Sequence, residues 1–190
     1  MQQLETVRRT AADRYAAEMT STTASASVYR APMRSPSADD ASAAEGAIAA
    51  GVVGLDGTIR ASVDDFDEML AAANHELDER TTRRILRFAQ TPTGSLVWTR
   101  DSSGGLHLGR LRGDWGYDPG DVARRLGLPH QRACDWANGP VPDALVPVSV
   151  IEAFARGGRN WQRIRAAGAS EASVRLWSHL NGLSTPNSSG

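Results

Sequence analysis

Apolar residues are spaced unevenly along the chain and divide it into three stretches. Over residues 1–19 a thin apolar stripe, starting at Leu4, recurs at helical spacing and predicts a short isolated helix. Residues 20–46 hold few large apolar side chains, and Ala, Ser, Thr and Pro fill 18 of these 27 positions. Such a stretch buries too little apolar surface to offset its ordering entropy, so we predict a flexible linker. The folded domain is therefore expected over residues 47–190.

Within that domain the pattern alternates between helical and strand-like periods. It predicts strands at 49–55, 96–99, 106–112, 131–136, 145–147 and 160–165, and helices at 62–77, 81–89, 119–126, from Ser149 and from Ser170. Turn residues and short connections separate the strands, which is typical of antiparallel or mixed pairing. We therefore expect an α+β fold, a small curved mixed or antiparallel β-barrel with flanking helices.

Charge changes this picture only locally. The 190 residues carry a formal net charge of −1, which gives no general attraction to nucleic acid. Residues 1–74 hold 6 arginines against 11 acidic residues, whereas residues 75–190 hold 15 arginines against 11. All 21 basic residues are arginine, whose planar fork suits phosphates and base edges. Neither a membrane-spanning run nor a secretory signal is visible, so we expect a cytoplasmic protein without a membrane partner.

Residues with catalytic or metal-binding chemistry are scattered. The four histidines form no metal-binding pair, and the glycine-rich pieces lack the Lys-Ser/Thr of a phosphate loop. The single cysteine, Cys134, falls within a predicted strand and is interpreted as a buried packing residue. Asp64, Asp65 and Asp67 fall at a helix start, where carboxylates favour the helix dipole. We therefore predict no catalytic residue, no metal and no cofactor.

Aromatic residues gather in the predicted strands, and their order resembles a known family. The relevant segments are Gly94-Ser95-Leu96-Val97-Trp98, Gly109-Arg110-Leu111-Arg112-Gly113-Asp114-Trp115-Gly116-Tyr117, His130-Gln131-Arg132-Ala133-Cys134-Asp135-Trp136, Phe154 and Trp161-Gln162-Arg163-Ile164. This series resembles modules of the PUA-like superfamily, including EVE-type modules and the N-terminal modules of Mrr-type restriction proteins. The likeness covers residues 85–165 well, 47–84 loosely and 1–46 not at all. Ser95 departs from the family's usual Asp, and residues 118–129 are longer than expected.

The resemblance implies a small curved barrel with a pocket that reads a modified or flipped base. The candidate ligand-binding residues are Trp98, Arg110, Trp115, Tyr117, Arg132 and Trp136. Aromatic faces and a guanidinium can sandwich a planar base. We thus expect a non-catalytic module that recognises nucleic acid, in a bacterial defence or mobile-element setting. The alternatives are a protein-interaction adaptor, with the N-terminal helix as docking arm, and an enzyme of unrecognised type.

Overall fold

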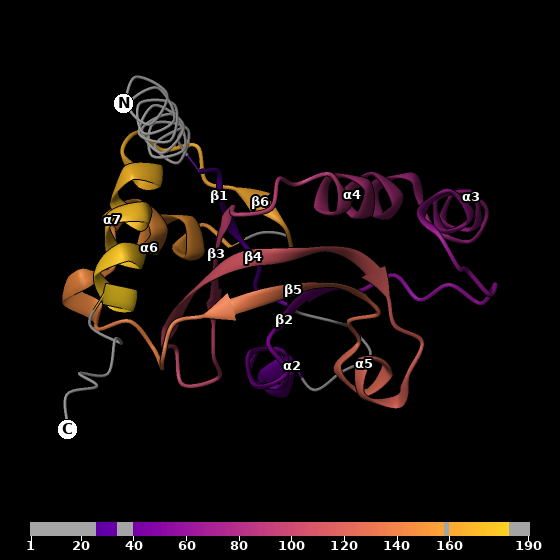
Figure 1. Cartoon of the computed structure of the whole chain (residues 1–190), viewed down its shortest axis with the longest axis horizontal. Helices are drawn as coiled ribbons and strands as arrows, with labels where there is room; N and C mark the ends of the chain where they lie inside the picture. Colours follow the sequence, from indigo (N-terminus) through magenta and orange to yellow (C-terminus); the bar gives the residue numbers. More distant parts are fainter. Residues whose placement is uncertain (1–25, 34–39, 158–159, 183–190) are drawn as a thin grey trace, which may run out of the picture.

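The computed structural model describes residues 26–33, 40–157 and 160–182, and it has an α+β fold. Over these residues, a mixed sheet of six strands curls into a half-barrel and six α-helices surround it (Figure 1). This arrangement confirms the predicted fold class, a small curved sheet with flanking helices. The helix predicted over 1–19 lies outside the described residues.

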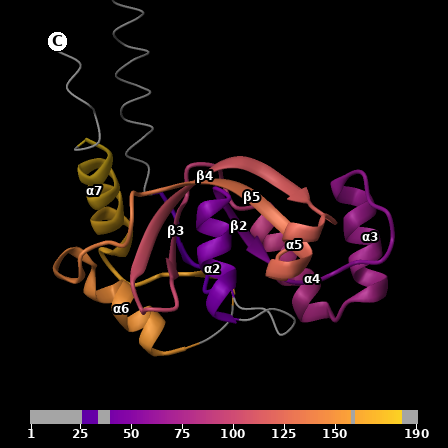
Figure 2. The ribbon, with the colours of Figure 1, turned by 90° about the horizontal axis from the view of Figure 1, so that it is seen from below.

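The elements follow one another in mixed order along the chain. The strands are β1 (Val28–Arg30), β2 (Val52–Leu55), β3 (Leu96–Arg100), β4 (Leu106–Tyr117), β5 (His130–Trp136) and β6 (Gln162–Arg163). The helices are α2 (Asp40–Ala49), α3 (Phe66–Glu76), α4 (Glu79–Ala89), α5 (Asp121–Leu126), α6 (Val148–Ala155) and α7 (Ala169–Gly182). Two perpendicular views place α6 and α7 at one end of the molecule and α3 at the other, with α2 and α5 between them (Figure 1, Figure 2).

The strands are ordered β2-β5-β4-β3-β1-β6 across the sheet. Only β1 and β3 run parallel; the other four pairings are antiparallel. Antiparallel neighbours need only short connections, which agrees with the turns seen in the sequence. Between β3 and β4, for example, the hairpin turns over residues 101–105, where Asp101 accepts the N–H of Gly105 at 2.7 Å.

Strand β4 is longer than predicted because an irregularity lets it continue past Arg112. Leu111 lies opposite Cys134 and Trp115 lies opposite Arg132, so four steps along β4 match two along β5. The two extra residues are an even number, so side chains beyond the irregularity return to the same face. Trp115 and Tyr117 therefore belong to the strand.

The linker predicted over 20–46 is wrong for the residues that the structure describes there. Val28–Arg30 forms β1, which is inserted between β3 and β6, and Asp40 begins α2. Val28 is buried, and β1 is hydrogen-bonded to strands on both sides. Composition underestimated this segment because its few large apolar side chains are in the core, where Val28 and Met33 are buried. Backbone hydrogen bonds also hold β1 in the sheet. The folded domain consequently begins before residue 47.

Two hydrophobic clusters lie on opposite faces of the sheet. Trp98 and Leu108 face α6 and α7, where the Trp98 indole N–H donates to the Ser173 hydroxyl at 3.1 Å. Leu111 and Cys134 face the other way, into a cluster that includes the small side chains of α2 and residues of α4. A third cluster joins α3 and α4 to the C-terminal end of β4. Alanines in α2 let its backbone lie close to the sheet, which also explains why its sequence lacks a large apolar stripe.

The helix boundaries follow local signals only in part. Asp65 caps α3 and Asp78 caps α4 through side-chain bonds to backbone N–H groups, and Gly127 ends α5 in the left-handed conformation with φ 64°. The helix predicted at 81–89 therefore begins earlier, at Glu79, and α6 begins at Val148 without a side-chain cap. The edge strand predicted at 145–147 is wrong, because residues 143–145 form a 3-10 turn. Ile151, near the start of α6, is exposed. Among the described segments, no helix combines the length and apolar character needed to cross a membrane.

Candidate nucleic-acid interface

Four of the six predicted site residues share one face of the sheet. Trp115 lies directly opposite Arg132 in the β4–β5 pairing, and residues directly opposite one another project to the same side. Tyr117 and Trp136 follow at even spacing on their strands and so occupy that face too. The two segments therefore lie together, as the spacing predicts.

Trp98 and Arg110 do not join this group. Trp98 is completely buried on the opposite face, against Ser173 of α7. Arg110 pairs with Leu96 across the β3–β4 ladder, on the same side as Trp98, and its side chain is exposed near the turn at Gly94. The structure thus separates the six predicted residues into two sets.

Arg132 is a buried structural residue. Its side chain donates to the Gly113 carbonyl at 2.9 and 2.8 Å, to the Phe88 carbonyl at 3.2 Å and to the Thr91 carbonyl. A further N–H reaches the Thr93 hydroxyl at 3.1 Å. Desolvation lowers the pKa of the guanidinium, but it remains charged at neutral pH. These bonds connect β4 to the end of α4, and they occupy the guanidinium N–H groups with protein acceptors.

Trp115 and Tyr117 pack against α3 and the chain before it. The ring of Trp115 meets Phe66 edge-on at 5.4 Å, and the Tyr117 hydroxyl exchanges hydrogen bonds with the N–H and C=O of Ile59, both at 2.9 Å. Between these rings lies His130, fully buried, whose Nε2 contacts the Gly57 carbonyl at 2.8 Å. Burial lowers the pKa of His130 to about 4. Both aromatic side chains are half-buried and support the α3 end of the fold.

Trp136 and Cys134 line the middle of the same face. The Trp136 indole N–H donates to the Val52 carbonyl at 3.1 Å and so ties β5 to β2. Both side chains lie over Gly109, where an added Cβ would come within 2.6 Å of each. Burial raises the pKa of the Cys134 thiol, so the sulfur stays protonated and unreactive.

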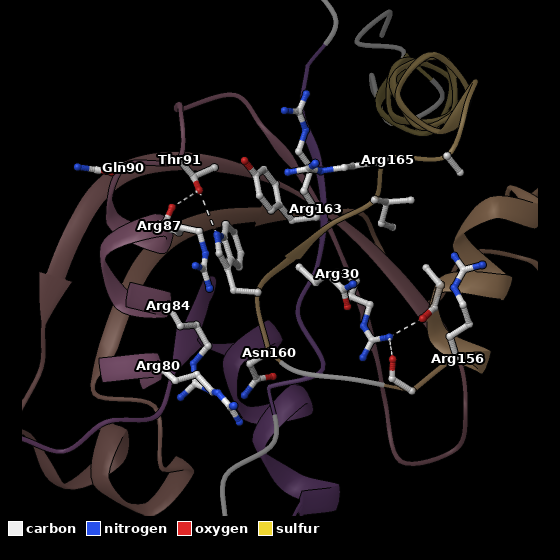
Figure 3. A pocket seen from close by; sticks show the side chains of 17 residues that line it. Arg30, Arg80, Arg84, Arg87, Gln90, Thr91, Arg156, Asn160, Arg163 and Arg165 are labelled. Carbon is white, nitrogen blue, oxygen red and sulfur yellow. Dashed lines mark hydrogen bonds between the residues drawn. The ribbon is translucent and has the colours of Figure 1, made fainter. Parts of the chain in front are cut away.

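A different part of the surface forms a large open groove of about 1180 Å³. It lies between α4 and the segment that runs from the end of α6 through β6, and β1 contributes to its floor. Seven arginines line it: Arg30, Arg80, Arg84, Arg87, Arg156, Arg163 and Arg165. Figure 3 shows these side chains arranged around the cavity, with those of α4 on one side and Arg163 and Arg165 on another. Among the described residues, no Asp or Glu lines the groove.

Helix α4 supplies one wall. Arg80, Arg84 and Arg87 recur at intervals of four and three residues, which places them on one helical face. The row spans about 10 Å at 1.5 Å per residue. The adjoining face of α4 buries Thr82, Ile85 and Phe88, so packing fixes which side presents the arginines.

The other wall comes from the end of α6 and from β6. Arg163 lies directly opposite Tyr29 in the β1–β6 pairing, and its side chain is exposed. Arg156 lies at the end of α6. The groove therefore has arginines from three separate elements facing a common space.

Arg30 supports this wall from below. It is buried, and its guanidinium donates to the carbonyls of Ala153 and Gly157 and lies 5.3 Å from the centre of the Phe154 ring. These contacts hold the end of α6 against β1, because both carbonyls come from that end of the helix.

An aromatic stack forms the floor. The rings of Tyr29 and Trp161 are parallel within 9°, with their centroids 4.7 Å apart, and Phe88 meets Trp161 edge-on at 4.6 Å. The Trp161 indole N–H donates to the Thr91 hydroxyl at 3.1 Å, and that hydroxyl donates to the Arg87 carbonyl at 2.7 Å. Trp161 has a left-handed backbone, with φ 59°, which is uncommon for a bulky residue. The hydrogen bonds thus fix the floor to the wall formed by α4.

Most of the positive charge in the groove is not neutralised locally. Arg84 pairs with Asp56 at 2.8 Å, and Arg156 lies 3.8 Å from Glu152. Within the described part of the chain, the other four exposed arginines of the groove have no carboxylate at ion-pair distance; they are Arg80, Arg87, Arg163 and Arg165. Clustered like charges repel one another, so such an arrangement favours a polyanionic ligand.

The sequence pattern alone does not indicate this groove. Arg80, Arg84 and Arg87 lie on the polar side of a predicted helix, where they resemble an ordinary solvated face. Tyr29 falls in the segment predicted as a linker. Only the fold brings these residues next to Arg163, more than 70 residues further along the chain than Arg87.

No three His, Cys, Asp or Glu side chains of the described segments are placed to hold a metal ion. We found that no protein-family model matches the chain, and that neither a curated protein nor a solved structure matches it.

Proposed function

We propose that this protein is a non-catalytic nucleic-acid-binding module and that the arginine-lined groove is its binding surface. The observation that carries the proposal is the set of seven arginines around one cavity, without an acidic side chain among the described lining residues. Arginine binds phosphates through a planar fork of N–H donors. A local field of this kind attracts a phosphate backbone although the whole chain has a net charge of −1.

A second hypothesis, derived from the PUA-like resemblance, places a modified or flipped base near Trp115, Tyr117, Arg132 and Trp136. Base recognition by Arg132 requires its guanidinium to leave four protein acceptors, which gives the groove the stronger support. Membership of the PUA-like superfamily and a role in bacterial defence stay predictions.

The test is direct binding at low salt, measured by the fluorescence anisotropy of labelled oligonucleotides. We expect Arg87→Gln and Arg165→Gln each to weaken binding and to reduce the slope of log K against log salt by about 0.7 to 0.9. Arg175→Gln is the matched control, because Arg175 is exposed on α7 outside the groove. Binding that is absent at low salt, or that falls equally in all three variants, contradicts the proposal.

The adaptor hypothesis rests on a separate observation. Leu145, Val148 and Ile151 are 46%, 69% and 42% exposed, and they lie close together in sequence around the start of α6. Exposed apolar side chains in one region favour a protein contact. The adaptor hypothesis replaces the nucleic-acid-binding proposal if two results are found. The unmodified chain binds no oligonucleotide, and Val148→Asp abolishes its capture of a protein partner.

A further inference from the structure

We infer that the groove binds single-stranded nucleic acid and stacks one unpaired base on Tyr29; this inference rests on the proposed function above. The floor of the groove, rather than its charge, distinguishes a single strand from other polyanions. A surface that recognised phosphates alone would need only the arginines. Here an aromatic ring lies between them.

Tyr29 is placed to receive a base. One face of its ring is covered by Trp161 at a centroid distance of 4.7 Å, whereas the side chain lines the groove and stays partly exposed. A base that lies on the accessible part of the ring would extend the existing stack of Tyr29 and Trp161 by one member. Every base has a π-face, so this contact is tolerant of sequence.

The stack is rigid before any ligand binds. Trp161 is 4% exposed and anchored through Thr91 to the end of α4, and its left-handed backbone is maintained by the surrounding contacts. Unusual backbone conformations that a fold maintains are found at binding sites more often than elsewhere. A preformed stacking surface lowers the entropy cost of ordering the site on binding.

The charges around Tyr29 match a backbone that runs past it. Arg163 lies opposite Tyr29 on β6, and Arg87 lines the groove from α4, on the other wall. Phosphates on either side of a stacked base would therefore meet arginines from both walls (Figure 3). This is the combination of a basic groove with aromatic platforms that single-strand binders use.

The size of the groove agrees with this ligand. Its volume of about 1180 Å³ is a little above the ~300–1,000 Å³ of pockets that hold a drug-sized molecule. In a duplex the bases are paired and cannot stack on the floor of the groove, whereas the bases of a single strand can.

The experiment compares the affinity of the full chain for three probes of equal length. They are a single-stranded oligodeoxynucleotide, the same strand with an abasic site at every third position, and the duplex. We expect the single strand to bind about tenfold more tightly than the abasic strand and the duplex at equal salt. This comparison needs no variant, so a destabilising substitution cannot obscure it.

Two variants then assign the preference to the ring. Tyr29→Leu should lower the affinity for the intact strand about tenfold and leave the affinity for the abasic strand unchanged. The slope of log K against log salt should stay the same. Tyr29→Phe keeps the ring and should bind like the unmodified chain. Thermal unfolding of both variants checks that β1 stays in the sheet.

The outcomes separate this inference from the function on which it rests. If the abasic strand or the duplex binds as tightly as the single strand, and Arg87→Gln still weakens binding, stacking is wrong but nucleic-acid binding holds. If free mononucleotides compete at equal molar concentration of phosphate, the ligand is a small nucleotide and the inference is overturned. If Arg87→Gln has no effect on any probe, the proposed function itself fails.

Discussion

Replacing Arg132 with alanine should destabilise the fold rather than remove a ligand contact. Arg132 is 2% exposed, and its guanidinium bonds the carbonyls of Gly113, Phe88 and Thr91 and the hydroxyl of Thr93. The Phe88 carbonyl also accepts the Thr91 N–H at 3.2 Å, so it keeps a partner in the variant. The Gly113 carbonyl, which accepts two of the guanidinium N–H groups, loses both.

The magnitude follows from what is left buried. Each hydrogen bond to a charged donor contributes about 1.5–3 kcal/mol, and an acceptor left unsatisfied in the interior costs about 1–3 kcal/mol. Lost bonds and cavity formation are not additive, so we expect Arg132→Ala to lower the free energy of unfolding by about 3–5 kcal/mol. This is a large part of the roughly 5–15 kcal/mol that holds a domain together.

Urea unfolding followed by tryptophan fluorescence measures this loss. With an m-value near 2 kcal/mol/M, a loss of about 4 kcal/mol lowers the midpoint by about 2 M. Arg132→Lys keeps the positive charge but not the planar guanidinium fork, so its free energy of unfolding should still fall by more than about 1 kcal/mol. Arg112→Ala is the control, because Arg112 is exposed and its ion pair with Asp135 is exposed too, so its midpoint should shift little. A loss below about 1 kcal/mol for Arg132→Ala refutes a structural role.

Three further predictions concern the same face of the sheet. Burial lowers the pKa of His130 in the folded protein to about 4, from its ordinary value of about 6.5, so stability should be fully present above pH 6.5 and fall by about 2 kcal/mol by pH 5. Unfolding of His130→Gln across this range should lack that dependence. Because burial raises the pKa of Cys134, its thiol should react with a disulfide reagent only on unfolding, and Cys134→Ala should bind oligonucleotides normally; rapid labelling of the native chain contradicts this. Tyr117→Phe removes the hydroxyl that bonds both backbone groups of Ile59 and should lower the free energy of unfolding by about 1–2 kcal/mol in the urea assay, whereas an unchanged midpoint means that this contact is not maintained in solution.

Local patterns predicted the elements whose cues lie close together in sequence. Leu96–Arg100 and the return strand are joined by a glycine-containing turn. Ile85 and Phe88 mark the buried side of α4, although the helix begins at Glu79, two residues before its predicted start. Such cues act within one turn or one hairpin, so a single sequence contains them. The extension of β4 to Tyr117 was missed because the irregularity after Leu111 depends on the partner strand.

Residues 26–33 and α2 were not predictable from composition for a physical reason. β1 has three residues and gains its stability from hydrogen bonds to β3 and β6, two strands that are distant in sequence. The α2 alanines contribute to the core through close packing, not through large side chains. Low hydrophobicity predicts disorder for a segment that would have to form a core from its own side chains. Here the neighbouring strands and helices supply the apolar surface against which the segment packs.

The candidate site, too, was predictable only where local spacing decides the geometry. Even spacing placed Trp115 and Tyr117 on one face, and the pairing with β5 agrees. Spacing could not show that Arg132 is saturated by backbone carbonyls, because those carbonyls come from Gly113 and from the end of α4. The groove was beyond prediction since it joins arginines from α4, α6 and β6, which have no sequence pattern in common.

The position of β1 links the fold to the proposed site. Among the strands that the structure describes, β6 pairs only with β1, so Arg163 reaches the groove through that single pairing. Tyr29 lies in the same three residues, and Arg30 beside it secures the end of α6. Floor and wall of the groove therefore depend on the insertion of β1 between β3 and β6. Val28 and Tyr29 also pack against the hydrophobic clusters on the two faces of the sheet, so displacement of β1 would remove core contacts together with the floor and wall of the groove.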